Sequence, residues 1–460
     1  MKAYESYVVT EYDWLQEVPA HWRRLPMRGI TALSDVRNGN RSDLELLSVY
    51  REYGVIPKAS RTDNHNVESE NLSNYKYVGT DYLVMNKMKM WQGSLGVSSY
   101  EGIVSPAYIV CRIVGDLNTR YLHRLLRTPQ YKIHYNRCSK GIRVGQWDFS
   151  YDNFKTLYVY LPPREEQDQI VRFLDWNVSE VNRFIRQKRR EIALLTELMN
   201  TRIKEAVFGG LNPSAAKQDS GIHWVGDIPA HWETKVLFEV AAEQSNSNKT
   251  VHNQNLLSLS YGKIVNKDIN TTDGLLPASY DTYQVVDDGN IILRLTDLQN
   301  DKRSLRVGIA TQTGIITSAY TCLKARGDDM LPHYLYLLLH SYDICKVFYS
   351  MGGGVRQSIG YGEIKRMSLP IPPTDEQQAI IDYCYALRAD TDKMIAELKR
   401  EIALITEYRT RMISDVVTGK VDVRDIAVPD VVTEEVIEES SDDEESDDIT
   451  DEEVEENADD

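Results

Sequence analysis

The sequence lacks the features by which several protein classes are recognised. It has no run of about 18 apolar residues, so no membrane-spanning helix is predicted. Its polar beginning, MKAYESYVVTEYDW, does not resemble a secretory signal. The five cysteines are odd in number and show no CxxC spacing, which argues against both a disulfide framework and a zinc site. We therefore expect reduced thiols, a cytoplasmic location and no bound metal.

Motifs of catalysis are also missing. The Asn/Asp-Pro-Pro-Tyr/Phe signature of adenine methylation is absent, because Asn212-Pro213 stands without a second proline. The glycines of 351–362 lack the Lys-Ser/Thr of a phosphate-binding loop. Residues 363–365 read EIK, a spacing found in metal-dependent nucleases, but the matching residues 153–155 read NFK and no partner aspartate is evident. We do not expect the chain to be an enzyme by itself.

Basic residues are absent from the end of the chain. From Asp430 to Asp460 there are 18 Asp or Glu and no Lys or Arg, and this tail accounts for the net charge of −16. Without it the chain carries +2, and residues 1–160 hold 21 basic and 16 acidic residues. Nucleic-acid binding by the body therefore stays open. The tail at 429–460 is predicted to be disordered; it either only solubilises the chain or competes with DNA for basic surfaces.

The chain that precedes this tail is one unit written twice. At a shift of 210 residues, PAHW at 19–22 returns at 229–232, and LPPREEQDQI at 161–170 becomes IPPTDEQQAI at 371–380. His21 and His231 stand in the repeated PAHW. As single histidines beside tryptophan, they are interpreted as packing and hydrogen-bonding residues rather than as ligands or bases.

Each unit is predicted to have a mixed part and a helical part. Short β-rich runs and helices are expected in the mixed parts, at 82–86, 107–114, 119–136, 290–295 and 332–349. The helical parts begin at proline pairs and contain no further Pro, and no Gly before Gly209 and Gly419, which fit C-terminal caps.

Apolar residues in the helical parts are spaced by three and four over about six heptads, which is typical of a coiled-coil seam. Contacts with the partner helix are expected from Ile185, Ile192, Leu195, Ile395, Ile402 and Ile405. The two helices of one chain would most simply pair antiparallel. The alternative is that each helix packs separately on its own domain.

These motifs resemble a known family. PAHW near the start of each unit, LPPREEQ and IPPTDEQ before each helix, and the TGKVDVRD ending at 418–425 resemble the specificity subunits of type I restriction–modification systems. The resemblance covers about residues 1–428. It implies an α+β fold with two target-recognition domains, two spacer helices and an internal pseudo-two-fold repeat. The expected boundaries are 1–160 and 211–370 for the domains, 161–210 and 371–428 for the helices, and 429–460 for the tail.

The resemblance also implies a function. Each recognition domain would read half of a split site in double-stranded DNA, and the helices would dock two DNA adenine methyltransferase subunits. Restriction and motor subunits would join through these. S-adenosylmethionine, ATP and Mg²⁺ would be bound by the partner subunits, and no cofactor by this chain.

Candidate DNA contacts come from loops rich in the side chains that read bases or bind phosphate. They are Lys87, Lys89, Lys140, Arg143, Gln146, Arg294, Lys302, Arg303, Arg306, Arg356 and Gln357. The best-matched pair is KGIRVGQ at 140–146 with GGGVRQS at 352–358, since both place Arg and Gln after a glycine-rich turn. In the alternative interpretation these loops are ordinary surface, and Arg143 and Arg356 anchor their turns to the domain.

Two rival functions remain at this point. The chain could be an interaction scaffold in which a coiled coil presents two domains to other proteins. It could also be a self-sufficient nuclease, although the missing acidic cluster argues against this.

Overall fold

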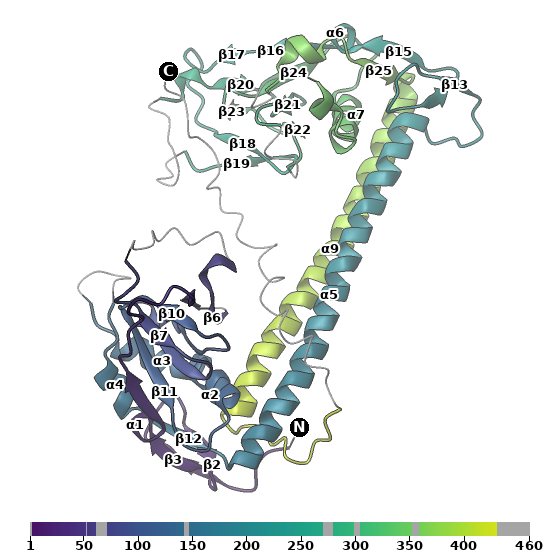
Figure 1. Ribbon diagram of the computed structural model, residues 1–460. Helices are drawn as coiled ribbons and strands as arrows, with labels where there is room; N and C mark the ends of the chain where they lie inside the picture. Colours follow the sequence, from purple (N-terminus) through teal and green to yellow (C-terminus); the bar gives the residue numbers. More distant parts are fainter. Residues whose placement is uncertain are drawn as a thin grey trace. The chain divides into compact units, whose positions relative to one another are not determined.

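The computed structural model describes residues 2–51, 53–60, 71–141, 147–269, 279–298, 304–351 and 358–429. The chain divides into two compact units. Unit 1 consists of two segments, one from the start of the chain to Gln187 and one that begins at Glu401. Unit 2 is built on Lys188–Arg400 between them. Each unit therefore contains one mixed domain and a stretch of both long helices (Figure 1).

The first domain is built on two four-stranded sheets. One has the order β4 (Thr31–Ser34), β11 (Tyr108–Ile113), β8 (Tyr82–Asn86), β9 (Leu95–Val97) and is antiparallel throughout. The other has the order β6 (Gly54–Pro57), β5 (Glu45–Tyr50), β10 (Gly102–Val104), β7 (Lys76–Val78), and its β5–β10 pair is parallel. The domain also contains two short strand pairs: β1 (Tyr7–Val9) with β2 (Glu17–Pro19), and β3 (Arg23–Pro26) with β12 (Tyr158–Leu161). Its helices are α1 (Met27–Ile30), α2 (Thr119–Leu126), α3 (Pro129–Cys138) and α4 (Tyr151–Thr156), with single turns η1 (Lys58–Ser60) and η2 (Met90–Gln92).

The second domain repeats this plan with changes. Its four-stranded sheet has the order β16 (Ala241–Gln244), β24 (Thr321–Ala325), β21 (Ile291–Leu293), β22 (Val307–Ile309). Smaller sheets join β17 (Asn246–Ser247), β20 (Gln284–Val286) and β23 (Gly314–Ile316), and β18 (Leu257–Ser260) with β19 (Lys263–Asn266). The outer pairs are β13 (Lys217–Asp219) with β14 (Asp227–Pro229), and β15 (Glu233–Val236) with β25 (Ser368–Ile371). Its helices are α6 (Leu237–Val240), α7 (Pro332–Ile344) and α8 (Tyr361–Ile364), with single turns η3 (Tyr280–Thr282) and η4 (Val347–Ser350).

The central strands are apolar along their whole length because each face of their sheet is covered. In β8, Leu83 and Met85 belong to the main core of unit 1, whereas Val84 belongs to a second cluster on the opposite face. In β21, Ile291 and Leu293 likewise face the main core of unit 2, and Ile292 faces a smaller one. Alternate residues of a strand point to opposite faces, so a strand between two cores reads as a continuous apolar run.

The two long helices are α5 (Arg164–Gly209) and α9 (Thr374–Val417), of 46 and 44 residues. Each begins after a proline pair and carries two acidic residues in its first turn, where carboxylates stabilise the positive end of a helix. At 1.5 Å per residue, they are about 69 and 66 Å long.

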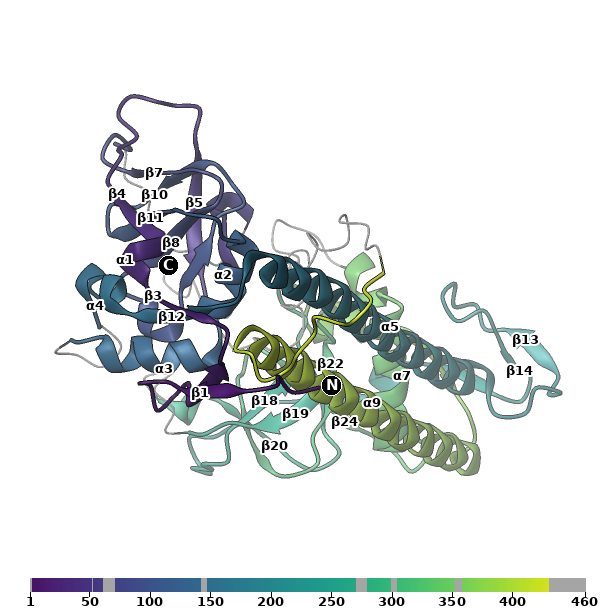
Figure 2. The same ribbon diagram turned by 90° about the horizontal axis from the view of Figure 1, so that it is seen from below.

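Within each unit the two helices run antiparallel. In unit 1 the beginning of α5 lies with the end of α9, since Ile170 and Leu174 share a core with Met412 and Val416. In unit 2 the end of α5 lies with the beginning of α9, since Ile203 and Ala206 share a core with the start of α9. Figures 1 and 2 draw the two helices side by side. The expected α+β fold, with paired antiparallel helices and an internal repeat, is confirmed.

Some elements differ from expectation. The helix expected at 119–136 is two helices, α2 and α3, because Pro129 cannot continue α2 and begins a new helix instead. Gly209 is still helical, and the left-handed residue that ends α5 is Gly210 (φ 74°). Gly419 (φ 80°) is the corresponding left-handed residue after α9. A Cβ added to Gly419 would lie 2.3 Å from Pro19. Across the described ranges, none of the helices is long and apolar enough to cross a membrane.

Candidate nucleic-acid interface

Two of the candidate lysines meet at the base of one loop in the first domain. Lys140 and Asp148 exchange backbone hydrogen bonds of 3.1 and 2.8 Å. The amide of Phe149 donates to the carbonyl of Lys87 at 3.1 Å, which ties this loop to the end of β8. Lys140 therefore stands at one end of a loop whose other end, at Asp148 and Phe149, contacts Lys87; the middle of the loop, 142–146, lies outside the described residues.

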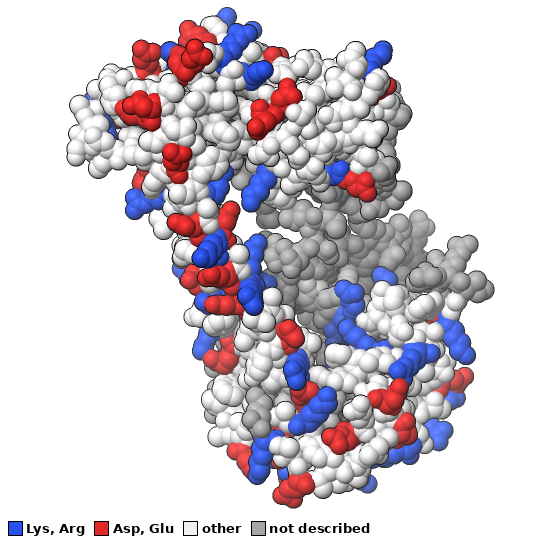
Figure 3. All heavy atoms as spheres, turned by 180° about the vertical axis from the view of Figure 1, so that it is seen from behind, with Lys and Arg blue, Asp and Glu red and all other residues white. Residues whose placement is uncertain are grey.

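The charges at this place are accessible. The ammonium group of Lys87 lies 2.7 Å from the Asp148 carboxylate, and the two side chains are 41% and 45% exposed. An exposed ion pair of this kind contributes only about 0–1 kcal/mol, so Lys87 can leave it for a phosphate. Lys89 is exposed and precedes the single turn η2. In Figure 3, Lys and Arg gather on the visible face of the first domain, while basic and acidic side chains alternate along the helices.

An aromatic pair lies beside these lysines, and the sequence interpretation missed it. The rings of Trp91 and Trp147 are 5.1 Å apart between centroids and inclined by 55°, and both side chains are half-buried. Trp91 stands two residues after the candidate Lys89, and Trp147 directly follows the candidate Gln146, which is the signal that could have identified them. Aromatic rings beside cations stack on the unpaired bases of single-stranded nucleic acids.

In the second domain the structure separates two candidate arginines. Arg294 is half-buried at the end of β21, and its amide donates to the carbonyl of Arg306 at 2.9 Å. Arg306 is fully buried. Its guanidinium donates to the carbonyls of Thr296 (2.6 Å) and Asp297 (3.3 Å). A side chain held in this way supports the loop from inside the domain and cannot reach a DNA groove. The prediction that Arg306 contacts DNA is therefore replaced by a structural role.

The remaining candidates are not placed by the structure. Arg143, Gln146, Lys302, Arg303, Arg356 and Gln357 lie outside the described residues. They stay predictions.

The repeated PAHW and the glutamate at the start of each long helix form one contact in both units. In unit 1, the Glu166 carboxylate accepts from the Trp22 indole at 3.0 Å and lies 2.7 Å from the imidazole of His21. In unit 2, the Glu376 carboxylate accepts from Trp232 at 3.0 Å and lies 2.5 Å from His231. The interpretation of the two histidines as hydrogen-bonding residues is confirmed. We call each of these contacts the domain–helix clasp.

The glutamine that follows the clasp glutamate makes a second repeated contact. Gln167 accepts from the amide of Asn118 and donates to the carbonyl of Pro162, both at 2.9 Å. Gln377 accepts from the amide of Leu331 and donates to the carbonyl of Pro372, again at 2.9 Å. The EEQ and DEQ motifs therefore fix each mixed domain to its helix. Sequence reasoning recognised the motifs but not their contacts.

Burial along the coiled-coil seam decreases toward the middle of the helices. Ile185 is buried, whereas Ile192, Leu195, Ile395, Ile402 and Ile405 are only half-buried. Large apolar side chains are also exposed on the same helices. One set in unit 1 consists of Phe184 (39%), Leu404 (57%) and Tyr408 (42%), and a matching set in unit 2 consists of Met394 (48%), Leu194 (55%) and Leu198 (54%); Tyr383 (39%) of α9 is also exposed but belongs to neither set. Each member of one set stands 210 residues from a member of the other.

The other chemical candidates have structural roles. The Glu363 carboxylate accepts from the amide of Gly360 at 2.8 Å and so caps α8. Burial raises the pKa of Cys111, Cys322 and Cys384 to about 12, which keeps these thiols protonated. No group of three or more His, Cys, Asp or Glu that could hold a metal ion occurs within the described ranges.

Comparisons with known proteins agree with this architecture. The chain is 25% identical over 315 residues to the putative type I restriction enzyme MjaX specificity subunit of Methanocaldococcus jannaschii, covering 66% of this chain and 68% of that protein. It is 23% identical over 402 residues to the type I restriction enzyme MjaVIII specificity subunit of the same organism, covering 78% and 89%. A chain from a study of complex assembly and conformational transition of the type I restriction–modification system shares the fold. It has a TM-score of 0.61 at 13% identity and covers 88% of this chain and 99% of its own.

The family model called type I restriction modification DNA specificity domain matches twice, at residues 28–194 and 231–404. Each match contains most of a mixed domain, a proline pair, a clasp glutamate and most of a long helix. Because the two matches cover well over half of the sequence and fall on the two copies of the repeat, this chain belongs to the family of type I restriction–modification DNA specificity proteins.

Proposed function

We propose that this chain is the DNA-reading subunit of a type I restriction–modification complex, and that each mixed domain reads one half of a two-part site. The observation that carries the proposal is that the two units share a structural frame, formed by their domain–helix contacts and long helices, but differ in their loops. The clasp, the glutamine contacts and the long helices repeat from one unit to the other. The loops after β8 and β21, which carry Lys87, Lys89, Arg294, Lys302 and Arg303, do not repeat, since NKMKMWQG at 86–93 stands against RLTDLQNDKRS at 294–304. A shared frame with different loops suits two domains that read different sequences.

In the first domain, DNA would contact the surface around Lys87 and Lys140. Its phosphates would displace Asp148 from Lys87, and Trp91 and Trp147 lie beside this place. The predicted contacts Arg143 and Gln146 belong to the same loop. In the second domain, Arg294 remains a candidate, together with Lys302, Arg303, Arg356 and Gln357. The domain boundaries of this proposal are those expected from the sequence, with recognition domains at 1–160 and 211–370.

The helices would dock two copies of a DNA methyltransferase. The exposed sets Phe184–Leu404–Tyr408 and Met394–Leu194–Leu198 are related by the repeat, so each could bind the same partner in the same way. Exposed apolar side chains that recur in this way are typical of protein interfaces. S-adenosylmethionine would be bound by these partners, and ATP and Mg²⁺ by restriction subunits that join them.

Exchange of one recognition domain tests the proposal. Residues 211–370 are replaced by the corresponding domain of a relative, and the complex with its methyltransferase is used to modify a random DNA library. One half of the modified site should change and the other should stay. A change in both halves would contradict independent readout. Absence of any selected sequence, with partner binding retained, would favour the scaffold function instead.

A further inference from the structure

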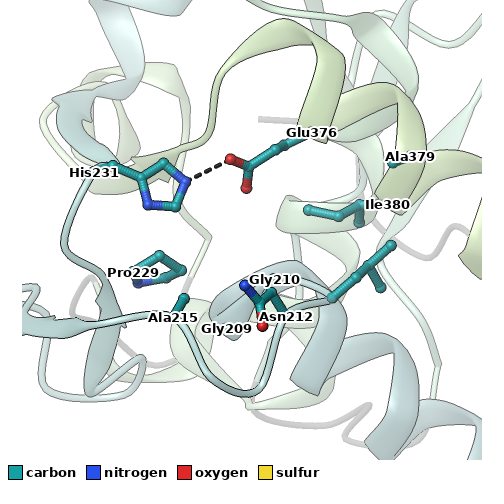
Figure 4. A pocket seen from close by; sticks show the side chains of 10 residues that line it. Gly209, Gly210, Asn212, Ala215, Pro229, His231, Glu376, Ala379 and Ile380 are labelled. Atoms are coloured by element: carbon teal, nitrogen blue, oxygen red, sulfur yellow. Dashed lines mark hydrogen bonds and ion pairs between the residues drawn. The ribbon is translucent and has the colours of Figure 1, made fainter.

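A pocket of about 170 Å³ lies beside the clasp of unit 2. Figure 4 shows His231 and Glu376 pointing toward each other and in contact among the residues that line it. Asn212, Pro229, Ala379 and Ile380 are among the other lining residues. The Glu376 side chain is 38% exposed, so the pocket offers a carboxylate next to apolar surface.

The matching place in unit 1 is filled by the chain itself. The phenol of Tyr4 donates to the Glu166 carboxylate at 2.8 Å, and the Arg424 guanidinium lies 4.9 Å from the centre of the Tyr4 ring. The Gln169 amide donates to the carbonyls of Val423 and Ile426 and so holds the last described segment against α5. As a result the Glu166 side chain is only 6% exposed.

Three differences leave the place in unit 2 open. Ser214 stands at the repeat position of Tyr4, and Ala379 stands at that of Gln169. The segment 423–428 has no counterpart after α5, because the chain there continues directly into the second domain. Glu376 therefore keeps the two donors of the clasp, His231 and Trp232, but lacks the phenol that Glu166 receives.

We propose that this pocket is a receptor for a tyrosine side chain of a partner protein, with an arginine close to it in the partner's sequence. The phenol would donate to Glu376 as Tyr4 donates to Glu166. The arginine would lie over the tyrosine ring, as Arg424, which pairs with Asp422 at 2.8 Å, lies over Tyr4 in unit 1. DNA is a poor occupant, because a phosphate would meet Glu376.

The acidic tail of the same chain is also a poor occupant. Residues 430–460 contain no Tyr, Phe, Trp, Lys or Arg, so they offer neither the ring nor the cation. A partner segment is therefore the occupant that fits by charge and shape. The proposal builds on the proposed role as a subunit of a complex and adds an asymmetry: the methyltransferase sites occur twice, whereas this receptor occurs once per chain.

The dipeptide acetyl-Tyr-Arg-amide is a suitable probe with the full-length chain, and binding is followed by ligand-observed NMR. A contact of this size should give a dissociation constant on the order of 1 mM. Replacement of Tyr by Phe in the probe should weaken binding several-fold, since only the phenol can donate to Glu376. The variants Ser214→Tyr and Ala379→Tyr fill the pocket from inside and should each abolish binding.

Three results would overturn the proposal: no binding of the Tyr-Arg probe at 10 times that concentration, equal binding of the Phe probe, or binding that survives both filling variants. A chain that lacks 430–460 and binds the probe much more tightly would show the tail to be the occupant, which also overturns it. DNA-site selection by the Ser214→Tyr chain is measured in parallel and should be unchanged. A failure there concerns the proposed function and not the receptor.

Discussion

Glu166 and Glu376 occupy the same position of the repeat but differ in burial, and this sets their energetic weight. The Glu166 side chain is 6% exposed and accepts from the Tyr4 and Trp22 side chains besides contacting His21. Glu376 is 38% exposed and has two of these three contacts. Hydrogen bonds to a buried charge contribute more than those at the surface, because the unpaired groups left behind cannot recover water.

The substitution Glu166→Gln should therefore destabilise the protein by about 2–3 kcal/mol, since an amide nitrogen replaces an acceptor amid three donors. Glu376→Gln serves as the matched control and should cost less than about 1 kcal/mol, because water can reach its partners. Chemical denaturation of the two variants and the wild type measures the difference. Equal losses would mean that burial of the clasp does not determine its strength.

Acid sensitivity at this scale is expected from His340. Burial, and after it the nearby Arg388, lowers its pKa from 6.5 to about 4, so the folded protein holds it neutral. The unfolded chain binds a proton near pH 6.5. The stabilisation is therefore complete above about pH 6.5 and is lost as the pH falls toward 4, at up to about 1.4 kcal/mol per pH unit. Burial lowers the pKa of His123 in the same direction.

The variant His340→Gln should have a shallower loss of stability between pH 6.5 and 4.5 than the wild type. Thermal denaturation at several pH values measures this slope. His252 is exposed, so His252→Gln is the matched control for a histidine-to-glutamine change outside the core. An identical slope for His340→Gln and the wild type would show that other groups govern the acid response.

The sequence shows which residue types stand in the candidate loops, but it did not predict whether each side chain is buried or exposed. Arg306 and Lys87 stand in similar polar loops, and nothing in their spacing separates them. The difference arises from tertiary contacts: Arg306 points inward to the carbonyls of Thr296 and Asp297, whereas Lys87 stays at the surface. The clasp could not be predicted from the sequence for a related reason: His21 and Glu166 are 145 residues apart, and only the fold brings them together.

At the scale of elements, the long helices were predicted best, because their heptad spacing extends over dozens of residues. Helix boundaries that depend on one residue were harder to predict. Pro129 separates α2 from α3, where a single helix was expected. Short strands such as β21, at Ile291–Leu293 within the expected 290–295, depend on pairing with distant strands. Local sequence does not contain that pairing.

Helix length should set the spacing between the two halves of the DNA site. The two units divide at Gln187–Lys188 in α5 and at Arg400–Glu401 in α9. Seven residues inserted at both places keep the seam in phase and leave the helix contacts inside each unit as they are. Each helix grows by about 10 Å, which corresponds to roughly three base pairs of 3.4 Å.

The gap between the two halves of the modified site should therefore lengthen by roughly three base pairs, with both halves unchanged. Sequencing of methylated DNA from the assembled complex measures it. Insertion into α5 alone is the control and should damage folding, because the helices no longer match in length. An unchanged gap in an active doubly inserted complex would mean that the methyltransferases fix the spacing.

For the whole molecule, the repeat predicts the number of partners. The exposed apolar set of unit 2 contains Leu194, and that of unit 1 contains its repeat mate Leu404. Both side chains are more than half exposed, at 55% and 57%, so replacing either by glutamate should leave the fold intact. A charge in the middle of an apolar interface, however, must be desolvated when a partner binds, which costs several kcal/mol.

We expect Leu194→Glu and Leu404→Glu each to remove one of two bound methyltransferase copies, and the double variant to remove both. Native mass spectrometry of the assembled complex counts the copies directly. The single variants should be equivalent, since the repeat makes their surroundings alike. If either one released both copies, the two sites would be coupled rather than independent. If neither released any, the partners would bind elsewhere, and the exposed apolar side chains of α5 and α9 would need another explanation.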